Sequence, residues 1–317
     1  MNTIAAIVVT YNRKDCLLNC LEAIRRQTLA PDVIYIIDNH STDGTSDTLY
    51  DNHYIADKIP QFVKEDHKSE SQIKSLYYDS SIPILYIYKS ENTGGAGGFY
   101  TGMKTAYEDG YKWLWMMDDD GIPAEDGVEQ LLRYSCKYEL KFANALVLNI
   151  NDKHSLSFFL DKKNKNSLDD YANKDVVYDR ITPFNGSFIH REVPEKIGFI
   201  KKEMFIWGDE MEYYHRCMYK KLCIGTVVKS IHYHPINTET AVNIFPFVNR
   251  FKVVIRSGKF ANMYYRNIGY VYYTYNRKKF YRILVSYFIY FNIRFMFYDF
   301  KRFLVAYIAG SKDKFGS

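Results

Sequence analysis

The feature that most constrains the fold is an apolar run that ends in three aspartates. Trp113–Met117 is apolar throughout, Asp118-Asp119-Asp120 follow it directly, and Gly121-Ile122-Pro123 comes next. A short, continuously apolar run is typical of a strand buried on both faces, and the glycine and proline end it. The chain therefore carries a cluster of carboxylates to the end of a buried strand.

These three carboxylates call for a positive charge. Like charges packed so closely repel, and the pKa of at least one carboxyl rises unless a cation offsets the repulsion. Oxygen ligands suit a hard divalent ion, Mg²⁺ or Mn²⁺. The alternative is a solvated acidic loop or a helix N-cap. The apolar run before the aspartates and Pro123 after them favour the metal site.

Strands and helices alternate in the first 120 residues. Helical patterns follow three further apolar runs, and the runs are Ile4–Val9, Val33–Ile37 and Ile84–Tyr88. This alternation predicts an α/β fold with a parallel sheet covered on both faces. Ligands of such sheets bind at the carboxyl ends of the strands. Thr10, Asp38, Gly94 and Asp118 all fall at such ends, so we expect four separate segments to meet in one crevice.

A glycine-rich stretch, Asn92–Phe99, follows one strand and opens a helix. Backbone N–H groups there can approach a phosphate or a sugar. It is not a P-loop, because no Gly-Lys-Ser/Thr follows. A dinucleotide fingerprint would place its glycines after the first strand, where Thr10-Tyr11-Asn12 stand instead. A plain tight turn remains the alternative.

Acidic and histidine residues recur in the second half of the chain. Asp209-Glu210-Met211-Glu212 opens a predicted helix, and a predicted strand from Cys223 leads to His232 and His234. Taken alone, the acids suit a helix N-terminus and the histidines suit ordinary surface or packed positions. The two histidines stand two residues apart, so both point to one side of an extended segment. One of them can complete an Asp-Asp-His metal shell.

Charge divides the chain. From Ile236 onward there are 14 Lys and Arg against three Asp and Glu, although the whole chain has a formal net charge of only +5. This basic tail interleaves aromatic residues, and helical spacing in it predicts one apolar face with basic flanks. We expect a helix pair lying on anionic lipid. The alternatives are an amphipathic hairpin packed on the rest of the chain or forming a homo-oligomer. No nucleic-acid motif accompanies the charge.

The compartment is also predicted. Five cysteines with no CxxC pair are typical of free thiols in a reducing environment. The first residues run straight into a strand-like segment, and no apolar stretch reaches the roughly 18 residues that span a bilayer. We therefore expect a cytoplasmic protein that attaches peripherally to the inner face of the membrane.

Taken together, the motifs resemble the GT-A-fold glycosyltransferases of family 2, over residues 3–236. The glycine-rich stretch and the triple aspartate look most like the galactofuranosyltransferases, with rhamnosyltransferases as close relatives. The segments that carry the resemblance are Val8–Arg13, Ile37–Thr45, Asn92–Phe99, Met117–Asp120, Asn185–Ser187, Asp209–Glu212 with Arg216, and His234.

The resemblance implies a mostly parallel, Rossmann-like GT-A sheet with flanking helices. Residues 1–125 would bind the nucleotide sugar, residues 126–236 would bind the acceptor, and residues 237–317 would form the membrane-associating or oligomerising tail. Thr10 and Asp38 would contact the base and ribose. The rest of the donor site would be formed by Tyr11, Arg13, Gly94, Gly95, Asp118 and Asp119.

The resemblance also assigns the metal and the base. Asp118, Asp120 and His234 would hold Mn²⁺ or Mg²⁺, with His232 as the fallback for His234. Glu210 stands at the place of the general base. Many family members have an aspartate there, so Asp209 remains the alternative.

The implied function is metal-dependent, inverting transfer of a sugar, with galactofuranose from UDP-galactofuranose as the leading donor. The acceptor would be a saccharide or a lipid-linked oligosaccharide in the synthesis of a cell-surface polysaccharide, such as a capsule or an O-antigen. The alternatives are rhamnose or another donor sugar, a nucleotidyltransferase that releases pyrophosphate, and a non-catalytic nucleotide-sugar-binding scaffold on the membrane. Glycoside hydrolysis fits less well, because it needs neither a nucleotide crevice nor a metal.

Overall fold

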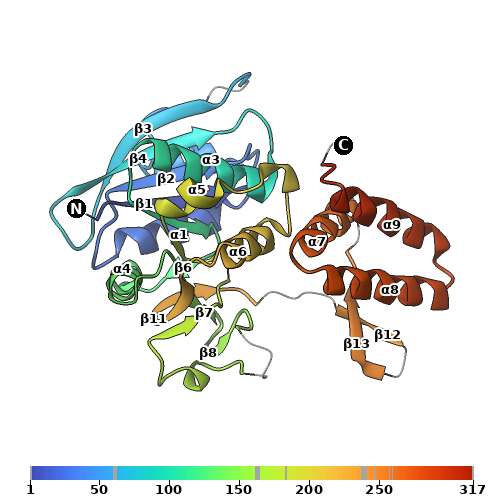
Figure 1. Cartoon of the computed structure of the whole chain (residues 1–317). Helices are drawn as coiled ribbons and strands as arrows, with labels where there is room; N and C mark the ends of the chain where they lie inside the picture. Colours follow the sequence, from blue (N-terminus) through green and yellow to red (C-terminus); the bar gives the residue numbers. More distant parts are fainter. Residues whose placement is uncertain are drawn as a thin grey trace. The chain divides into compact units, whose positions relative to one another are not determined.

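The chain forms two compact units. The first comprises Met1–Lys202 with Lys220–Asn237, and the second comprises Glu203–Tyr219 with Thr238–Ser317. The computed structural model describes residues 2–59, 63–160, 165–182, 184–236, 241–245, 248–256, 258 and 260–315 (Figure 1). The boundary expected at residue 236 adjoins residues 237–240, which lie outside the described residues. The three-part functional division therefore stays a prediction.

A mixed sheet organises the first unit, and the α/β fold predicted from the sequence is confirmed. Half of the sheet is parallel. Its strands, in spatial order, are β4 (Ser81–Tyr88), β2 (Val33–Asp38), β1 (Ile4–Thr10) and β5 (Trp113–Asp118). In the register, Thr10 lies opposite Asp38, and Val9 lies opposite Asp118. The predicted strand ends therefore meet at one edge of the sheet.

Helices cover both faces of this half-sheet, which is why its strands are apolar at every position. Ala6 and Val8 of β1 belong to a core that includes residues of α1 and α4. Ile7 and Val9 face α3, where Cβ atoms on Gly102 and Gly98 would lie 2.4 and 2.5 Å from them. These two glycines therefore allow α3 to pack closely on the sheet. The helices of the first unit are α1 (Lys14–Arg25), α2 (Thr45–Asp51), α3 (Gly94–Glu108), α4 (Gly127–Lys137) and α5 (Glu192–Ile197).

The other half of the sheet is mixed. An antiparallel strand, β10, separates β5 from β7, and β7 runs parallel to β11. The sequence analysis missed β3, which pairs antiparallel with β4 and buries only every fourth residue. The remaining strands of the sheet are β3 (His67–Lys74), β6 (Ile122–Pro123), β7 (Phe142–Asn149), β8 (Asp152–Leu156), β9 (Val176–Tyr178), β10 (Ser187–His190) and β11 (Ile224–His234).

The second unit is mainly helical. Aromatic residues form its core, and stacked rings join Tyr287 to Phe303 and Phe280 to Tyr307. No described helix is both long and apolar enough to cross a membrane. The elements are the 3-10 turn η2 (Lys202–Met204), which begins at the boundary between the units, and α6 (Asp209–Tyr219), β12 (Ala241–Phe245), β13 (Val248–Val254), α7 (Ala261–Tyr275), α8 (Arg277–Ile293) and α9 (Phe297–Ser311).

Candidate active site

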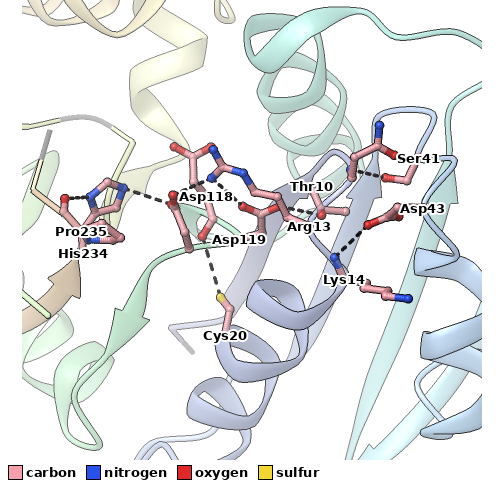
Figure 2. Close-up of polar contacts among 12 residues, drawn as sticks. Thr10, Arg13, Lys14, Cys20, Ser41, Asp43, Asp118, Asp119, His234 and Pro235 are labelled. Carbon is pink, nitrogen blue, oxygen red and sulfur yellow. Dashed lines mark hydrogen bonds and ion pairs between the residues drawn. The ribbon is translucent and has the colours of Figure 1, made fainter. Parts of the chain in front are cut away.

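The aspartate triplet, Asp118–Asp120, lies at the carboxyl end of β5 and is tied to the end of β1 (Figure 2). The hydroxyl of Thr10 donates a hydrogen bond to Asp119 Oδ2 over 2.7 Å. Arg13 reaches across the same edge, with Nη1 2.6 Å from Asp120 Oδ2 and 3.4 Å from Asp119 Oδ1. Asp119 thus joins the two strand ends, and Arg13 offsets part of the triplet's charge.

His234, the last residue of β11, approaches the triplet from the other half of the sheet (Figure 2). Its Nε2 lies 3.1 Å from Asp120 Oδ1, and its Nδ1 lies 2.6 Å from the carbonyl oxygen of Pro235. Burial acts to lower the pKa of His234, but the ion pair with Asp120 raises it above the ordinary value. Burial acts to raise the pKa of Asp120, but His234 and Arg13 lower it.

The carboxyl groups of Asp118 and Asp119 lack comparable compensation. Burial, followed by the negative charges of Asp120 and Asp119, raises the pKa of Asp118 to about 8. Burial likewise raises the pKa of Asp119 to about 6, although Thr10 and Arg13 act to lower it. With all three carboxyl groups ionised, the site would therefore hold more negative charge than Arg13 and His234 neutralise.

Repulsion among these carboxylates favours a bound cation, so the next question is whether the residues present suit a metal ion. The expected ligands supply carboxylate oxygens and an imidazole nitrogen, which suit Mn²⁺ and Mg²⁺. Oδ1 of Asp120 is buried and faces Nε2 of His234 at 3.1 Å, so two of the expected ligand groups lie next to each other. The described residues contain no preformed group of three His, Cys, Asp or Glu side chains around a common point. The chemistry of the site fits a divalent ion, and the ligand set stays a prediction.

Asp38 and Asn39 shape the neighbouring strand end. Both carboxylate oxygens of Asp38 are used within the protein, by the backbone N–H of Ser41 at 2.7 Å and by the hydroxyl of Tyr86 at 2.8 Å. Asn39 donates to the carbonyl oxygen of Gly94 at 2.8 Å and accepts from the backbone N–H of Thr93 at 2.9 Å. Asn39 was not predicted, although its place directly after a strand end was a usable signal.

The glycine-rich stretch forms the first turns of α3 at the same edge. Gly94 has a positive φ of 71°, and its N–H donates to Oδ1 of Asn92. A Cβ atom on Gly95 would face open space. Tyr11, at the end of β1, is 46% exposed. The predicted donor-site residues of the first unit therefore gather around one edge, and their contacts with a donor stay predictions.

His232 packs against Gly121, the residue that follows the aspartate triplet. It is 1% exposed, and neither ring nitrogen has a hydrogen-bond partner within the described part of the chain. Burial, followed by the positive charge of His234, lowers the pKa of His232 to about 3, so the ring is neutral. It packs against two glycines, since a Cβ atom on Gly121 or Gly186 would lie 2.2 or 3.0 Å from the ring.

The acidic pair Asp209–Glu210 belongs to the second unit, at the start of α6. Oε2 of Glu210 accepts a hydrogen bond from the backbone N–H of Gly208 over 3.0 Å. Glu212 is 1% exposed, forms an ion pair with Arg216 and accepts from the hydroxyl of Tyr275 over 2.8 Å. These contacts give Glu212 and Arg216 a structural role. The catalytic role of the pair stays a prediction.

Comparison with known proteins decides the family. The model of the family described as "Glycosyl transferase family 2" matches residues 5–62 and 57–188, more than half of the chain. The chain belongs to glycosyl transferase family 2. The glycosyltransferase class and the family predicted from the motifs are therefore confirmed.

Two relatives of this family 2 glycosyltransferase are galactofuranosyltransferases. It is 29% identical to galactofuranosyltransferase GlfT1 of Mycobacterium tuberculosis over 243 residues, which cover 75% of this chain and 71% of the relative. It is 26% identical to GlfT1 of Mycolicibacterium smegmatis over 245 residues, which cover 74% and 72%. The predicted resemblance to galactofuranosyltransferases is confirmed.

A solved structure shares the fold. The structure of GalNAc-T7 with UDP, GalNAc and Mn²⁺ matches with a TM-score of 0.56 at 13% sequence identity. The match covers 89% of this chain but only half, 50%, of that protein. At this identity the likeness shows the GT-A fold alone.

Proposed function

We propose that this enzyme transfers galactofuranose from UDP-galactofuranose to a saccharide or a lipid-linked oligosaccharide. The observation that carries the proposal is the similarity to two galactofuranosyltransferases over about three quarters of the chain. The gathering of Thr10, Arg13 and the aspartate triplet at one sheet edge supports it. A cell-surface polysaccharide is the corresponding product.

In this proposal the first unit holds the donor. Asp38 and Asn39 order the turn that would receive the base and ribose, and the start of α3 offers backbone N–H groups to the diphosphate. Asp118, Asp120 and His234 would hold Mn²⁺ or Mg²⁺, because a cation relieves the repulsion among the buried carboxylates. The ion, when bound, offsets the charge that develops on the departing diphosphate.

The acidic pair supplies the base. Glu210 accepts the proton from the acceptor hydroxyl, while the acceptor oxygen forms a bond to the anomeric carbon and the bond from that carbon to UDP breaks. Attack on the face opposite the leaving group inverts the anomeric centre in one step. Asp209, the more buried of the pair, is the alternative base.

Binding and turnover together test these roles. Calorimetry in the presence of Mn²⁺ should show that Asp120→Asn binds UDP at least tenfold more weakly than the wild type does. The control is Asp47→Asn, at an exposed aspartate of the same unit, which should bind UDP like the wild type. Glu210→Gln should keep UDP affinity but lower UDP release from UDP-galactofuranose by about 10²-fold or more. The matched control is Glu203→Gln, at an exposed position of the same unit. Wild-type turnover by Glu210→Gln and Asp209→Asn would overturn the base assignment.

The tail is proposed to bind anionic lipid peripherally. Phe295, in the turn between α8 and α9, is 80% exposed, and Tyr298, in the first turn of α9, is 74% exposed. Exposure of rings of this size is costly in water. The basic excess of the tail supplies attraction to anionic headgroups. Flotation with phosphatidylserine vesicles should fall when Phe295 and Tyr298 are both replaced by serine. Equal flotation of that variant and the wild type would contradict the proposal.

A further inference from the structure

The segment that leads into the acidic pair has an unusual backbone. Phe205 and Trp207 have positive φ angles of 65° and 59°, and Gly208 has a φ of 106°. A side-chain-bearing residue in this region is disfavoured by about 1–2 kcal/mol. Two such residues within three positions persist only where the surroundings hold them in place. The structure therefore has to contain a feature that fixes residues 204–208.

Asn267 of α7 is that feature. Its side chain is fully buried, and its Nδ2 lies 2.8, 3.0 and 2.7 Å from the carbonyl oxygens of Met204, Ile206 and Trp207. An amide nitrogen carries two hydrogens, so two carbonyls share one of them. All three partners are acceptors, which requires the nitrogen of the amide to face the segment. Asn267 therefore gathers three backbone carbonyls, from within four consecutive residues, around one donor group.

Arg266 fixes the orientation of this amide. Its Nε donates to Oδ1 of Asn267 over 3.1 Å, so the oxygen points away from the segment. Its Nη2 lies 3.1 and 3.3 Å from the carbonyl oxygens of Glu203 and Met204. Two neighbouring residues of α7 thus hold the backbone from 203 to 207.

The contact continues to the carboxylates. A Cβ atom on Gly208 would lie 3.1 Å from Cβ of Asn267, so this position needs glycine for both space and φ. The N–H of Gly208 donates to Oε2 of Glu210, and the carbonyl oxygen of Gly208 accepts the N–H of Glu212 in the first turn of α6. The conformation that Asn267 imposes therefore sets where α6 begins and where Glu210 points. Figure 1 draws α6 and α7 next to each other, and both belong to the second unit.

We propose that Asn267 is a positioning residue for the acidic pair Asp209–Glu210. It holds residues 204–208 in the backbone conformation, with Phe205, Trp207 and Gly208 at positive φ, from which α6 starts. A C-terminal helix would thus support the catalytic carboxylates. This inference rests on the proposed role of the pair as the base. It predicts that removing the amide affects turnover and leaves donor binding intact, because the donor residues lie in the first unit.

The test compares Asn267→Asp with Asn262→Ala, a change at an exposed position of the same helix. Aspartate has the shape of asparagine but turns an oxygen toward three carbonyl oxygens. We expect kcat for UDP release from UDP-galactofuranose with Mn²⁺ to fall roughly 10- to 100-fold, as a displaced catalytic group does. KM for the donor and the affinity for UDP should stay within twofold of the wild type. Hydrogen exchange at the amides of residues 204–212 should become faster.

The outcomes separate the two proposals. Asn267→Asp with wild-type kcat and wild-type exchange overturns the positioning role. If Asn267→Asp does not yield folded protein, Asn267→Ser, which shortens the side chain and adds no charge, takes its place under the same criteria. If Asn267→Asp exchanges faster while Glu210→Gln and Asp209→Asn keep full activity, the base assignment is refuted instead. Asn262→Ala should match the wild type in every measurement.

Discussion

Gly121→Ala should disturb the aspartate triplet through His232. A methyl group at Gly121 would lie 2.2 Å from Nε2 and 2.9 Å from Cε1 of that ring, where ordinary contacts are 3.4–4 Å. The ring or the turn must therefore move by about 1.2 Å. The ring has little freedom, because it is 1% exposed and Gly186 packs on its other side. We expect the turn that carries Asp120 to move instead.

The expected magnitude follows from this overpacking. Forcing a methyl group into a packed site destabilises a protein by about 1–3 kcal/mol. If the displaced Asp120 loses that much interaction energy with the ligand, the affinity for UDP with Mn²⁺ falls by roughly 5- to 150-fold. Titration calorimetry measures the affinity, and urea unfolding measures the stability. Gly127→Ala is the control, since its nearest neighbours would lie at 3.5–3.7 Å.

A second substitution makes the test sharp. His232→Ala removes the ring that the new methyl group meets, so the double variant should be less unstable than the sum of the single variants by about 1 kcal/mol or more. Gly121→Ala with wild-type UDP affinity, or a coupling energy of zero between Gly121 and His232, would refute the reasoning.

Three further changes test other parts of the structure. Arg216→Ala leaves the buried Glu212 carboxylate without its ion-pair partner and should destabilise the second unit by about 3–5 kcal/mol in urea unfolding, whereas a loss below about 1 kcal/mol would contradict the pairing. Gly310→Ala places a methyl group 1.9 Å from a carbonyl oxygen of α7 and should lower the melting temperature of that unit; an unchanged temperature would show that the helices pack otherwise. Burial acts to raise the pKa of Asp66, but hydrogen bonds from Lys89 and Ser90 lower this pKa below its ordinary value. The Asp66 carboxylate therefore stabilises the folded protein at pH values above the unfolded pKa of about 4, and this stabilisation is lost as the pH falls below that value. Asp66→Asn should therefore destabilise the protein at pH 7 and have a shrinking effect toward pH 3.5, and a constant effect across that range would argue against the pair.

The fold of the first unit could be predicted where buried elements have a recognisable apolar pattern in the sequence. Strands covered on both faces are apolar at every position, so β1, β2, β4 and β5 were found together with their ends. β3 was missed because it lies at the edge of the sheet, where only Ser69 and Ile73 are buried. An edge strand of polar residues has no pattern that separates it from a loop.

The candidate site was predictable in part for the same reason. Strand ends predicted which side chains meet, and the contacts between Thr10 and Asp119 agree with that expectation. The sequence did not predict that both carboxylate oxygens of Asp38 accept hydrogen bonds within the protein. These bonds come from the hydroxyl of Tyr86 and from the backbone N–H of Ser41 in the following turn. Asn267 could not have been singled out, since its partners are backbone carbonyls about 60 residues away and a lone asparagine in a helix has no distinguishing pattern.

Release of UDP by the purified enzyme tests the central claim most directly. UDP is measured with UDP-galactofuranose and with UDP-galactopyranose, each with Mn²⁺ and with EDTA, and Asp120→Asn serves as the inactive control. The account predicts release that is at least tenfold faster with the furanose donor and that disappears with EDTA. Equal release from both donors, or release that EDTA leaves unchanged, would contradict it.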